Sequence, residues 1–339
     1  MNLEAGPLFD KIVVGDRVAI GKAMTLVESE RPQDRAAAMD LLAQCEKQVQ
    51  KTPPTLRLAI SGAPGAGKST LIESLGLRAI AQGHKVGVIT VDPSSTLSHG
   101  SILGDKSRMT GLSTSPHAFI RSSPAGQVLG GLGRRSLELI TVLEAAGFNL
   151  ILVETVGVGQ SEHMAWQLTD GFILVVQPGA GDELQGIKRG ITELADIVII
   201  NKADGALKEL ARLTQSHYTN ALHYFSSVRE NWTPQTFSCS ALEGSGIDEI
   251  LEGIRSYRNT LMQAGQWHTE RNKQKLAWLD WSLGISAHEL LINHPIIRKK
   301  MESAIRDVTQ SDAPLYKTAY QIESAMAALI QSPNPNPEI

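Results

Sequence analysis

The stretch Gly62-Ala63-Pro64-Gly65-Ala66-Gly67-Lys68-Ser69 lies between the apolar run Leu56 to Ile60 and a segment of helical apolar spacing, Thr70 to Ile80. This order predicts a strand, a glycine-rich loop and a helix. In that context the pattern G-x-x-x-x-G-K-[ST] binds phosphate, because the glycines let successive backbone N–H groups face an anion and the helix N-terminus adds positive potential. We expect Gly62 to Thr70 to bind nucleotide, with Lys68 at the β- and γ-phosphates and the Ser69 hydroxyl on Mg²⁺. The alternative is a glycine-rich turn that a lysine follows by chance.

The overall composition is that of an ordinary globular protein, with 42% hydrophobic and 20% charged residues and a formal net charge of -3 in 339 residues. No apolar run approaches the roughly 18 residues of a membrane span, and Met1 to Asp10 contains no basic segment. We therefore expect a cytoplasmic protein without membrane contact. The slightly acidic charge argues against nucleic acid as the main partner. The two cysteines, Cys45 and Cys239, lie far apart, which excludes a disulfide framework and a cysteine-based zinc site.

The central part of the chain alternates between short apolar runs and segments of helical spacing. This alternation predicts an α/β fold with a doubly wound, mostly parallel sheet that helices cover on both faces. The expected strands are Leu56 to Ser61, Val86 to Val91, Ala118 to Arg121, Leu150 to Glu154, Gly171 to Val176, Ile197 to Ile200 and Thr236 to Ser238.

Helical patterns without strands occupy both ends of the chain. We therefore expect an N-terminal helical extension at 1–50, a nucleotide-binding domain at 51–264 and a C-terminal helical arm at 265–339. In the arm, apolar residues recur at helical spacing in three successive segments. Three of the five tryptophans lie at its start, which is compatible with core packing or with a subunit interface, where large aromatic residues are enriched; they are Trp267, Trp278 and Trp281.

The segment Asn201-Lys202-Ala203-Asp204 directly follows the expected strand Ile197 to Ile200. Loops at the carboxyl ends of strands bind the ligand in a doubly wound sheet. A carboxylate at Asp204 can accept hydrogen bonds from both N1–H and N2–H₂ of guanine, whereas adenine lacks that pair of donors and would leave the acid unpaired. Asn201 would hold the loop, and the stem of Lys202 would lie along the base. The alternative is a polar turn between a strand and a helix.

A further contact to the base is expected from Ser240-Ala241, after the strand Thr236 to Ser238. A backbone N–H in this loop could donate to the O6 atom of guanine. A Ser-Ala dipeptide by itself predicts nothing; this one indicates a base contact only because it follows the other motifs in the expected order along the chain.

Glu154-Thr155-Val156-Gly157 ends another expected strand, at a position where GTPases usually carry Asp-x-x-Gly. The Glu154 carboxylate would hold Mg²⁺ through a bound water, and the Gly157 N–H would contact the γ-phosphate. The next residue is the apolar Val158, where small Ras-like GTPases place a glutamine that orients the attacking water. We therefore expect slow intrinsic hydrolysis unless a partner supplies the missing group.

Two more acidic residues fall in expected loops. Asp92 follows the strand Val86 to Val91, and Asp105 lies in Leu103-Gly104-Asp105-Lys106-Ser107-Arg108. Because Mg²⁺ prefers oxygen ligands and keeps several waters, one or two carboxylates beside Ser69 would complete a site. The alternative is that both are ordinary surface acids.

Taken together, these residues resemble those of the methylmalonyl-CoA mutase-associated GTPases, the MeaB/ArgK type within the SIMIBI class of P-loop GTPases. The resemblance extends along the chain, and Glu154 and the long segment Gln177 to Lys188 distinguish this family from other GTPases. The matching stretches are 62–70, 91–95, 102–109, 153–162, 177–188 and 201–204.

The resemblance implies that Asp92, Asp105 and Glu154 surround Mg²⁺ and the γ-phosphate as catalytic residues, together with Lys68. It implies that the C-terminal helices form a homodimer and that the protein is a GTP-dependent chaperone of an adenosylcobalamin-dependent acyl-CoA mutase. It also implies that residues 179–188 form a switch that senses the partner, with Gly179, Asp182, Glu183 and Lys188 as its expected residues.

Two alternative functions, a small-molecule kinase and a nickel-delivery GTPase, would use the same type of phosphate loop. A small-molecule kinase has little need for a guanine-reading segment such as Asn201 to Asp204. A nickel-delivery GTPase needs a cluster of histidines or cysteines, whereas the nine histidines here are scattered.

Overall fold

The computed structural model describes residues 5–92, 108–124, 135–155, 161–179, 189–223, 229, 231–310 and 313–331. It contains a seven-stranded sheet in the order β3-β2-β4-β1-β5-β6-β7, in which all neighbouring strands are parallel. The expected doubly wound sheet is therefore confirmed. The strands are β1 (Leu56–Gly62), β2 (Val86–Asp92), β3 (Ala118–Pro124), β4 (Leu150–Glu154), β5 (Gly171–Val176), β6 (Ile197–Ile200) and β7 (Gln235–Ser238).

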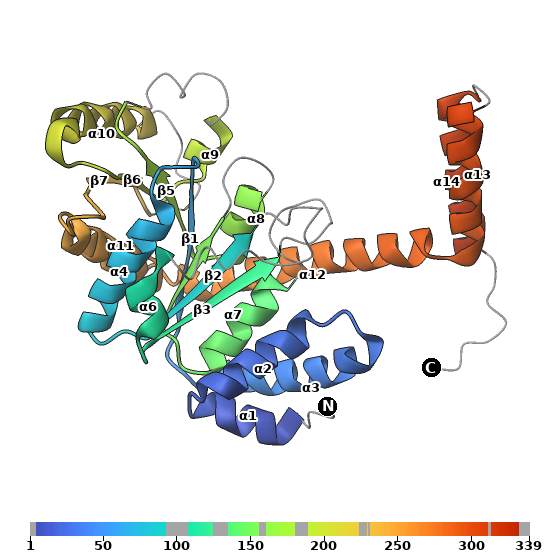
Figure 1. The fold of residues 1–339 in the computed structure, drawn as a ribbon, viewed down its shortest axis with the longest axis horizontal. Helices are drawn as coiled ribbons and strands as arrows, with labels where there is room; N and C mark the ends of the chain where they lie inside the picture. The colour runs from blue at the N-terminus through green and yellow to red at the C-terminus, as the bar shows by residue number, and fades with distance from the viewer. Residues whose placement is uncertain are drawn as a thin grey trace. The chain divides into compact units, whose positions relative to one another are not determined.

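Helices cover both faces of the sheet, as the ribbon in Figure 1 shows. The helices α4, α6 and α11 pack on one face, where they share an apolar core with β1 and β2, and α7 and α8 pack on the other. The helices between and after these strands are α4 (Lys68–Ala81), α6 (Thr110–Thr114), α7 (Ser136–Ala145), α8 (Ser161–Leu168), α9 (Arg189–Glu193), the 3-10 helix η2 (Gly205–Leu207), α10 (Lys208–Leu222) and α11 (Ile247–Gln263).

Strand β1 lies at the switch point of the sheet. The strands β4, β2 and β3 extend from one side of it, and β5, β6 and β7 extend from the other. In open α/β sheets the crevice outside the carboxyl ends of the strands at such a point binds the ligand. The topology therefore places a ligand site at the end of β1.

The N-terminal extension forms α1 (Ala5–Val13), α2 (Arg17–Glu28) and α3 (Pro32–Val49), which pack with α7. Asp16 caps α2, because its Oδ1 atom accepts hydrogen bonds from the N–H groups of Val18 and Ala19 at 2.8 and 2.9 Å. The first turn of α2 is also fixed to the central domain, since Arg17 donates to the carbonyl of Ser115 at 3.1 Å. The contacts of Arg17, which also donates to the carbonyl of Ala118, hold the extension near the edge strand β3.

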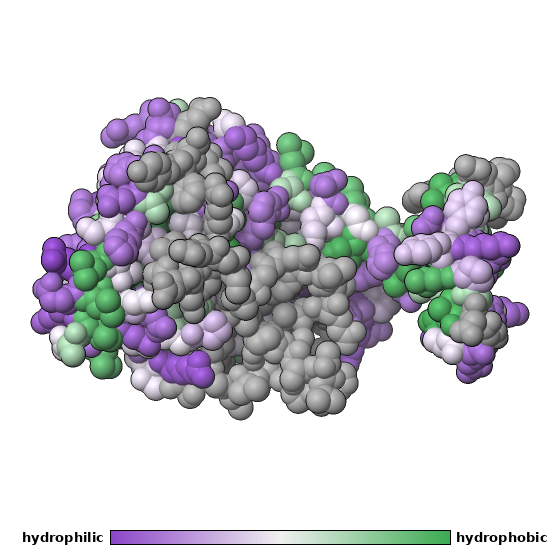
Figure 2. Space-filling model, turned by 90° about the horizontal axis from the view of Figure 1, so that it is seen from above, coloured by the Kyte–Doolittle hydropathy of each residue, from purple (hydrophilic) through white to green (hydrophobic). Residues whose placement is uncertain are grey.

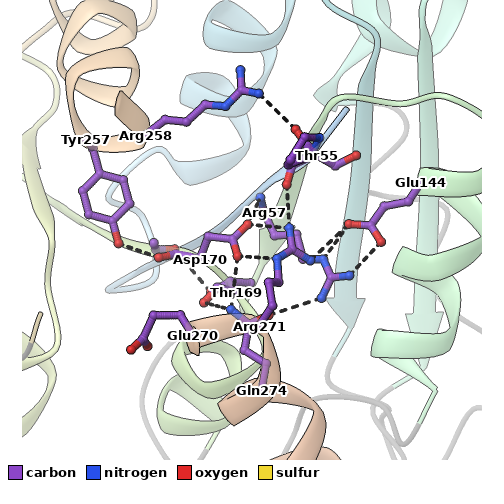
Figure 3. Close-up of polar contacts among 12 residues, drawn as sticks. Thr55, Arg57, Glu144, Thr169, Asp170, Tyr257, Arg258, Glu270, Arg271 and Gln274 are labelled. Carbon is purple, nitrogen blue, oxygen red and sulfur yellow. Dashed lines mark hydrogen bonds and ion pairs between the residues drawn. The ribbon is translucent and has the colours of Figure 1, made fainter. Parts of the chain in front are cut away.

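The amino ends of the strands carry a network of buried charged residues, which Figure 3 shows in close-up. Arg57 on β1 donates through two nitrogens to the two oxygens of Glu144 on α7, each at 2.7 Å. Arg271 joins Glu144, at 3.2 Å, to Asp170, at 2.8 Å. Burial alone would raise the pKa of Glu144, but its ion pairs with Arg57 and Arg271 outweigh burial and hold that pKa below its usual value. Glu144 is therefore ionised at neutral pH.

The chain divides into two compact units at Ala277, within α12 (Gln266–Ile292). In the first unit, Trp267 is buried in the apolar core, so core packing is the correct interpretation of this tryptophan. In the second unit, α13 (Pro295–Gln310) packs on α14 (Leu315–Gln331). The expected division into 1–50, 51–264 and 265–339 stays a prediction about domain organisation. None of the helices in the described part of the chain combines the length and apolarity that a membrane crossing needs.

Candidate nucleotide site

The glycine-rich loop lies between the end of β1 at Gly62 and the start of α4 at Lys68. Two of its glycines are required by close approach and by backbone conformation. A Cβ atom on Gly62, whose φ is +153°, would lie 2.1 Å from the carbonyl oxygen of Val175, and one on Gly67, whose φ is +88°, would lie 2.4 Å from Nδ2 of Asn201. Larger residues at these two positions would separate the loop from β5 and from the segment after β6.

Lys68 is buried and bends back over the loop. Its ammonium donates to the carbonyl oxygens of Gly62 at 2.9 Å and Ala63 at 3.4 Å. An ammonium in this position lies within the curve of the loop, where the N–H groups at the start of α4 also converge. The group is therefore placed to contact an anion that the loop holds.

Ser69 and Glu154 meet at the carboxyl ends of β1 and β4. The Ser69 hydroxyl donates to Oε1 of Glu154 at 3.0 Å, and the Glu154 side chain is buried. The register pairs Ile60 with Glu154, so the parallel ladder itself brings the strand end beside the loop. A hydroxyl and a carboxylate in contact are hard oxygen donors of the kind that Mg²⁺ prefers. The two residues therefore fit a shared magnesium ion.

The other residues expected around the metal and the γ-phosphate are only partly described. The backbone of Asp92 ends β2, the strand next to β4, so it lies at the same edge of the sheet as Glu154. Within the described ranges, no group of three or more His, Cys, Asp or Glu residues forms a metal-binding cluster. The remaining expected residues lie outside the described part of the chain: Asp105, Gly157, Asp182, Glu183 and Lys188.

Asn201 joins the two halves of the site. Its Nδ2 group donates to the carbonyl oxygen of Ala66 at 3.0 Å, and its Oδ1 atom accepts from the N–H of Ala241 at 3.0 Å. The Cys239 thiol lies 3.6 Å from the same oxygen, and burial raises its pKa to about 12, so it stays protonated and serves as a donor. One buried side chain thus connects the phosphate loop to the loop after β7.

Asp204 is held by the loop after β7. Its Oδ2 atom accepts from the Ser240 hydroxyl at 2.5 Å, and that hydroxyl accepts in turn from the N–H of Glu243 at 3.1 Å. The side chain of Ser240 is fully buried, whereas that of Asp204 is half-buried. The structure therefore brings Asn201, Asp204 and Ser240 together at one end of the phosphate loop.

Two contacts in the site involve residues that the sequence did not predict to touch the segment Asn201 to Asp204. Gln177 accepts a hydrogen bond from the ammonium of Lys202 at 3.3 Å, and Cys239 contacts Asn201. A signal for Gln177 was present in the chain, because it follows β5 directly, as Asn201 follows the neighbouring β6. Cys239 gave no such signal, since a lone buried cysteine is usually a small apolar residue.

The fold and the site define a P-loop GTPase: a phosphate-binding loop after β1, an acidic residue ending β4, and an Asn-Lys-x-Asp segment after β6. A family model described as "Methylmalonyl Co-A mutase-associated GTPase MeaB" matches residues 20–293. The chain belongs to this family of GTPases.

Known proteins of the same kind cover most of the chain. A probable GTPase of Mycobacterium tuberculosis is 42% identical over 309 residues, which is 91% of each chain. The mitochondrial methylmalonic aciduria type A homolog of Mus musculus is 41% identical over 89% of this chain and 74% of its own. A crystal structure of a LAO/AO transport system kinase has a TM-score of 0.74 and 31% identity, and covers 96% of this chain and 99% of its own.

Proposed function

We propose that this GTPase is a chaperone of an adenosylcobalamin-dependent methylmalonyl-CoA mutase, and that it hydrolyses GTP slowly until the mutase stimulates it. The observation that carries the proposal is the contact of Ser69 with Glu154. Glu154 at this strand end and the long segment Gln177 to Lys188 distinguish the mutase-associated family, which the sequence resembles, from other GTPases. The apolar Val158 supports slow intrinsic hydrolysis. The description of the matching family supports the choice of partner.

In this proposal the phosphate loop from Gly62 to Thr70 holds the β- and γ-phosphates with Lys68. Ser69 and Glu154 hold Mg²⁺, and Asp92 and Asp105 join them at the γ-phosphate. The metal, when bound, offsets the charge that develops on the phosphate oxygens during hydrolysis. Gly157 contacts the γ-phosphate, and residues 179–188 sense the partner. The guanine base is recognised by Asn201, Lys202, Asp204, Ser240 and Ala241, whose described contacts support this role.

The same proposal includes a homodimer formed through the C-terminal arm. Large apolar side chains are exposed on the second compact unit, and Figure 2 shows apolar residues interspersed with polar ones on the surface of α13 and α14. Exposed apolar surface of this kind marks protein interfaces. Those with more than half of the side chain exposed include Leu290, Ile296, Ile305, Leu315, Tyr316, Tyr320 and Ile330.

The proposal is tested with the full-length protein and a methylmalonyl-CoA mutase. GTP hydrolysis is measured alone and with added mutase, and complex formation is followed with a non-hydrolysable GTP analogue. We expect stimulation on the order of tenfold or more, because groups supplied in trans have large effects on phosphoryl transfer. No complex and no stimulation would contradict the chaperone role. Phosphorylation of an added small molecule from ATP, without preference for GTP, would favour a kinase instead.

A further inference from the structure

Gln177 and Lys202 lie at the ends of neighbouring parallel strands. The register pairs Val176 with Ile200, and the ammonium of Lys202 donates to Oε1 of Gln177 at 3.3 Å. We propose that Gln177 is a positioning residue for guanine nucleotide binding, which acts by holding the side chain of Lys202 in place. The inference rests on the proposed role of Asn201 to Asp204 in base recognition.

The backbone of Lys202 is held in an unusual conformation. Its φ of +63° lies in the left-handed region, which a residue with a long side chain rarely adopts. The surrounding contacts maintain it, since the N–H of Ala203 donates to the carbonyl of Cys239 at 2.9 Å. The side chain then runs beside the phosphate loop, because its Cε atom would lie 3.9 Å from a Cβ on Gly67. Lys202 thus extends from the phosphate loop to Gln177.

A neutral amide suits the task of holding this lysine. The ammonium has three donors and no acceptor, and its four-carbon stem loses considerable rotational freedom when it is fixed. The amide oxygen of Gln177 orients the group and leaves its positive charge intact. A preorganised lysine binds its ligand more tightly, because the side chain is already ordered before binding.

The turn that begins at Gln177 is attached to α10 through Gly179. The N–H of Gly179 donates to Oγ1 of Thr214 on α10 at 3.2 Å, and that side chain is buried. The helix α10 follows Asp204 after the single turn η2. The turn at 177–179 is therefore attached at one end to Lys202 and at the other to α10.

The test replaces the amide with a side chain of similar length that accepts no comparable hydrogen bond. In the full-length protein, Gln177→Met should release a fluorescent N-methylanthraniloyl GDP about three- to tenfold faster in stopped-flow measurements, as expected for the loss of one hydrogen bond of typical net strength. Gln177→Glu restores an acceptor and should release the probe more slowly than Gln177→Met. Gln82→Met is the matched control, since Gln82 accepts from Arg255 at 3.1 Å on the exposed surface, and should not change the rate.

A double-mutant cycle separates positioning from a general structural effect. If Gln177 acts through Lys202, Gln177→Met should have no further effect on the release rate in a Lys202→Met background. An undiminished effect in that background, or release at the wild-type rate by Gln177→Met, would overturn the inference. If Gln177→Met does not fold, Gln177→Leu, which also lacks an acceptor, replaces it in the same measurements with the same expected outcomes.

The outcome is also distinguishable from failure of the proposed function. If Asp204→Asn leaves guanine selectivity intact, the assignment of the base-recognition segment fails. If Asp204→Asn loses selectivity while Gln177→Met releases the probe at the wild-type rate, only the role of Gln177 fails.

Discussion

The two ends of the parallel strands hold their polar residues in different ways. At the amino ends, the buried Glu144 forms ion pairs with both Arg57 and Arg271 (Figure 3). At the carboxyl ends, Lys68 bonds to backbone carbonyls of its own loop. A phosphate can replace carbonyl acceptors around a lysine, whereas nothing outside the chain replaces a buried carboxylate between two arginines. We therefore expect the amino ends of the strands to contribute mainly to stability and the carboxyl ends mainly to ligand binding.

The hydrogen-bond networks at the two ends of the strands also connect different parts of the molecule. The amino-end network extends to α12, since Gln274 donates to the carbonyl of Thr169 at 3.0 Å and Arg229 contacts Glu270 at 3.1 Å. It therefore fixes the first turns of α12 to the first compact unit. The carboxyl-end network is centred on Asn201, which joins loops that each present groups to a ligand. Substitutions at the amino ends of the strands should therefore lower stability, whereas substitutions at the carboxyl ends should lower nucleotide binding or hydrolysis.

The largest effect on stability is expected at the amino end. Glu144→Gln leaves the buried Arg57 without its anionic partner and removes one of the two carboxylates that bind Arg271, so it should lower the free energy of unfolding by about 3–5 kcal/mol, as for other broken buried ion pairs. Urea denaturation followed by circular dichroism measures this change. Glu209→Gln is the control, because Glu209 pairs with Arg212 on the surface at 3.2 Å and should leave the midpoint unchanged. Equal midpoints for all three proteins would contradict the stabilising role.

At the carboxyl end the largest effect should be on turnover. Lys68→Ala removes the cation beside the phosphate and should reduce GTP hydrolysis by about 100-fold or more, with little change in the unfolding midpoint. Phosphate release at saturating GTP provides the measurement, and Lys47→Ala on α3 is the surface control. Hydrolysis at the wild-type rate in Lys68→Ala would remove the phosphate loop from the mechanism.

A smaller effect is expected on base selectivity. Asp204→Asn removes the carboxylate that is proposed to pair with N1–H and N2–H₂ of guanine, so the preference for GTP over ITP should fall by about 10-fold or more. Competition binding of the two nucleotides measures this ratio. Asp248→Asn is the matched control, because Asp248 pairs with Arg78 on the surface. An unchanged ratio for Asp204→Asn would refute the assignment.

The smallest expected effect is a dependence on pH. Because the folded pKa of Glu144 lies below the usual value of 4.5, its stabilising contribution is complete above that value and is lost as pH falls through the folded pKa. The difference in unfolding free energy between the wild type and Glu144→Gln should therefore be constant above pH 4.5 and shrink below it. Urea titrations at a series of pH values test this. A difference that grows on acidification would have the wrong sign.

The strands and the motifs at their carboxyl ends could be predicted from the sequence, because each depends on residues that are close together in the chain. All seven expected strands are present, because apolar runs between turn signals are a local property of the chain. The phosphate loop and the segment Asn201 to Asp204 each carry their chemistry within a few residues. Arg57 could not be placed in this way. A charged residue between Leu56 and Leu58 is typical of the exposed face of a strand, but Arg57 is buried. Its burial depends on Glu144, which is 87 residues away in the chain.

The sequence alone determined the parallel α/β class, the phosphate loop and the resemblance to mutase-associated GTPases, because strand periodicity and motif spacing are set by neighbouring residues. The folded structure adds that Asn201 joins the two halves of the site, that Gln177 accepts a hydrogen bond from Lys202, and that Arg57, Glu144 and Arg271 form one network. These contacts connect side chains that are distant in sequence and adjacent only because parallel strands align their ends. Their energy depends on burial and geometry, which exist once the chain has folded.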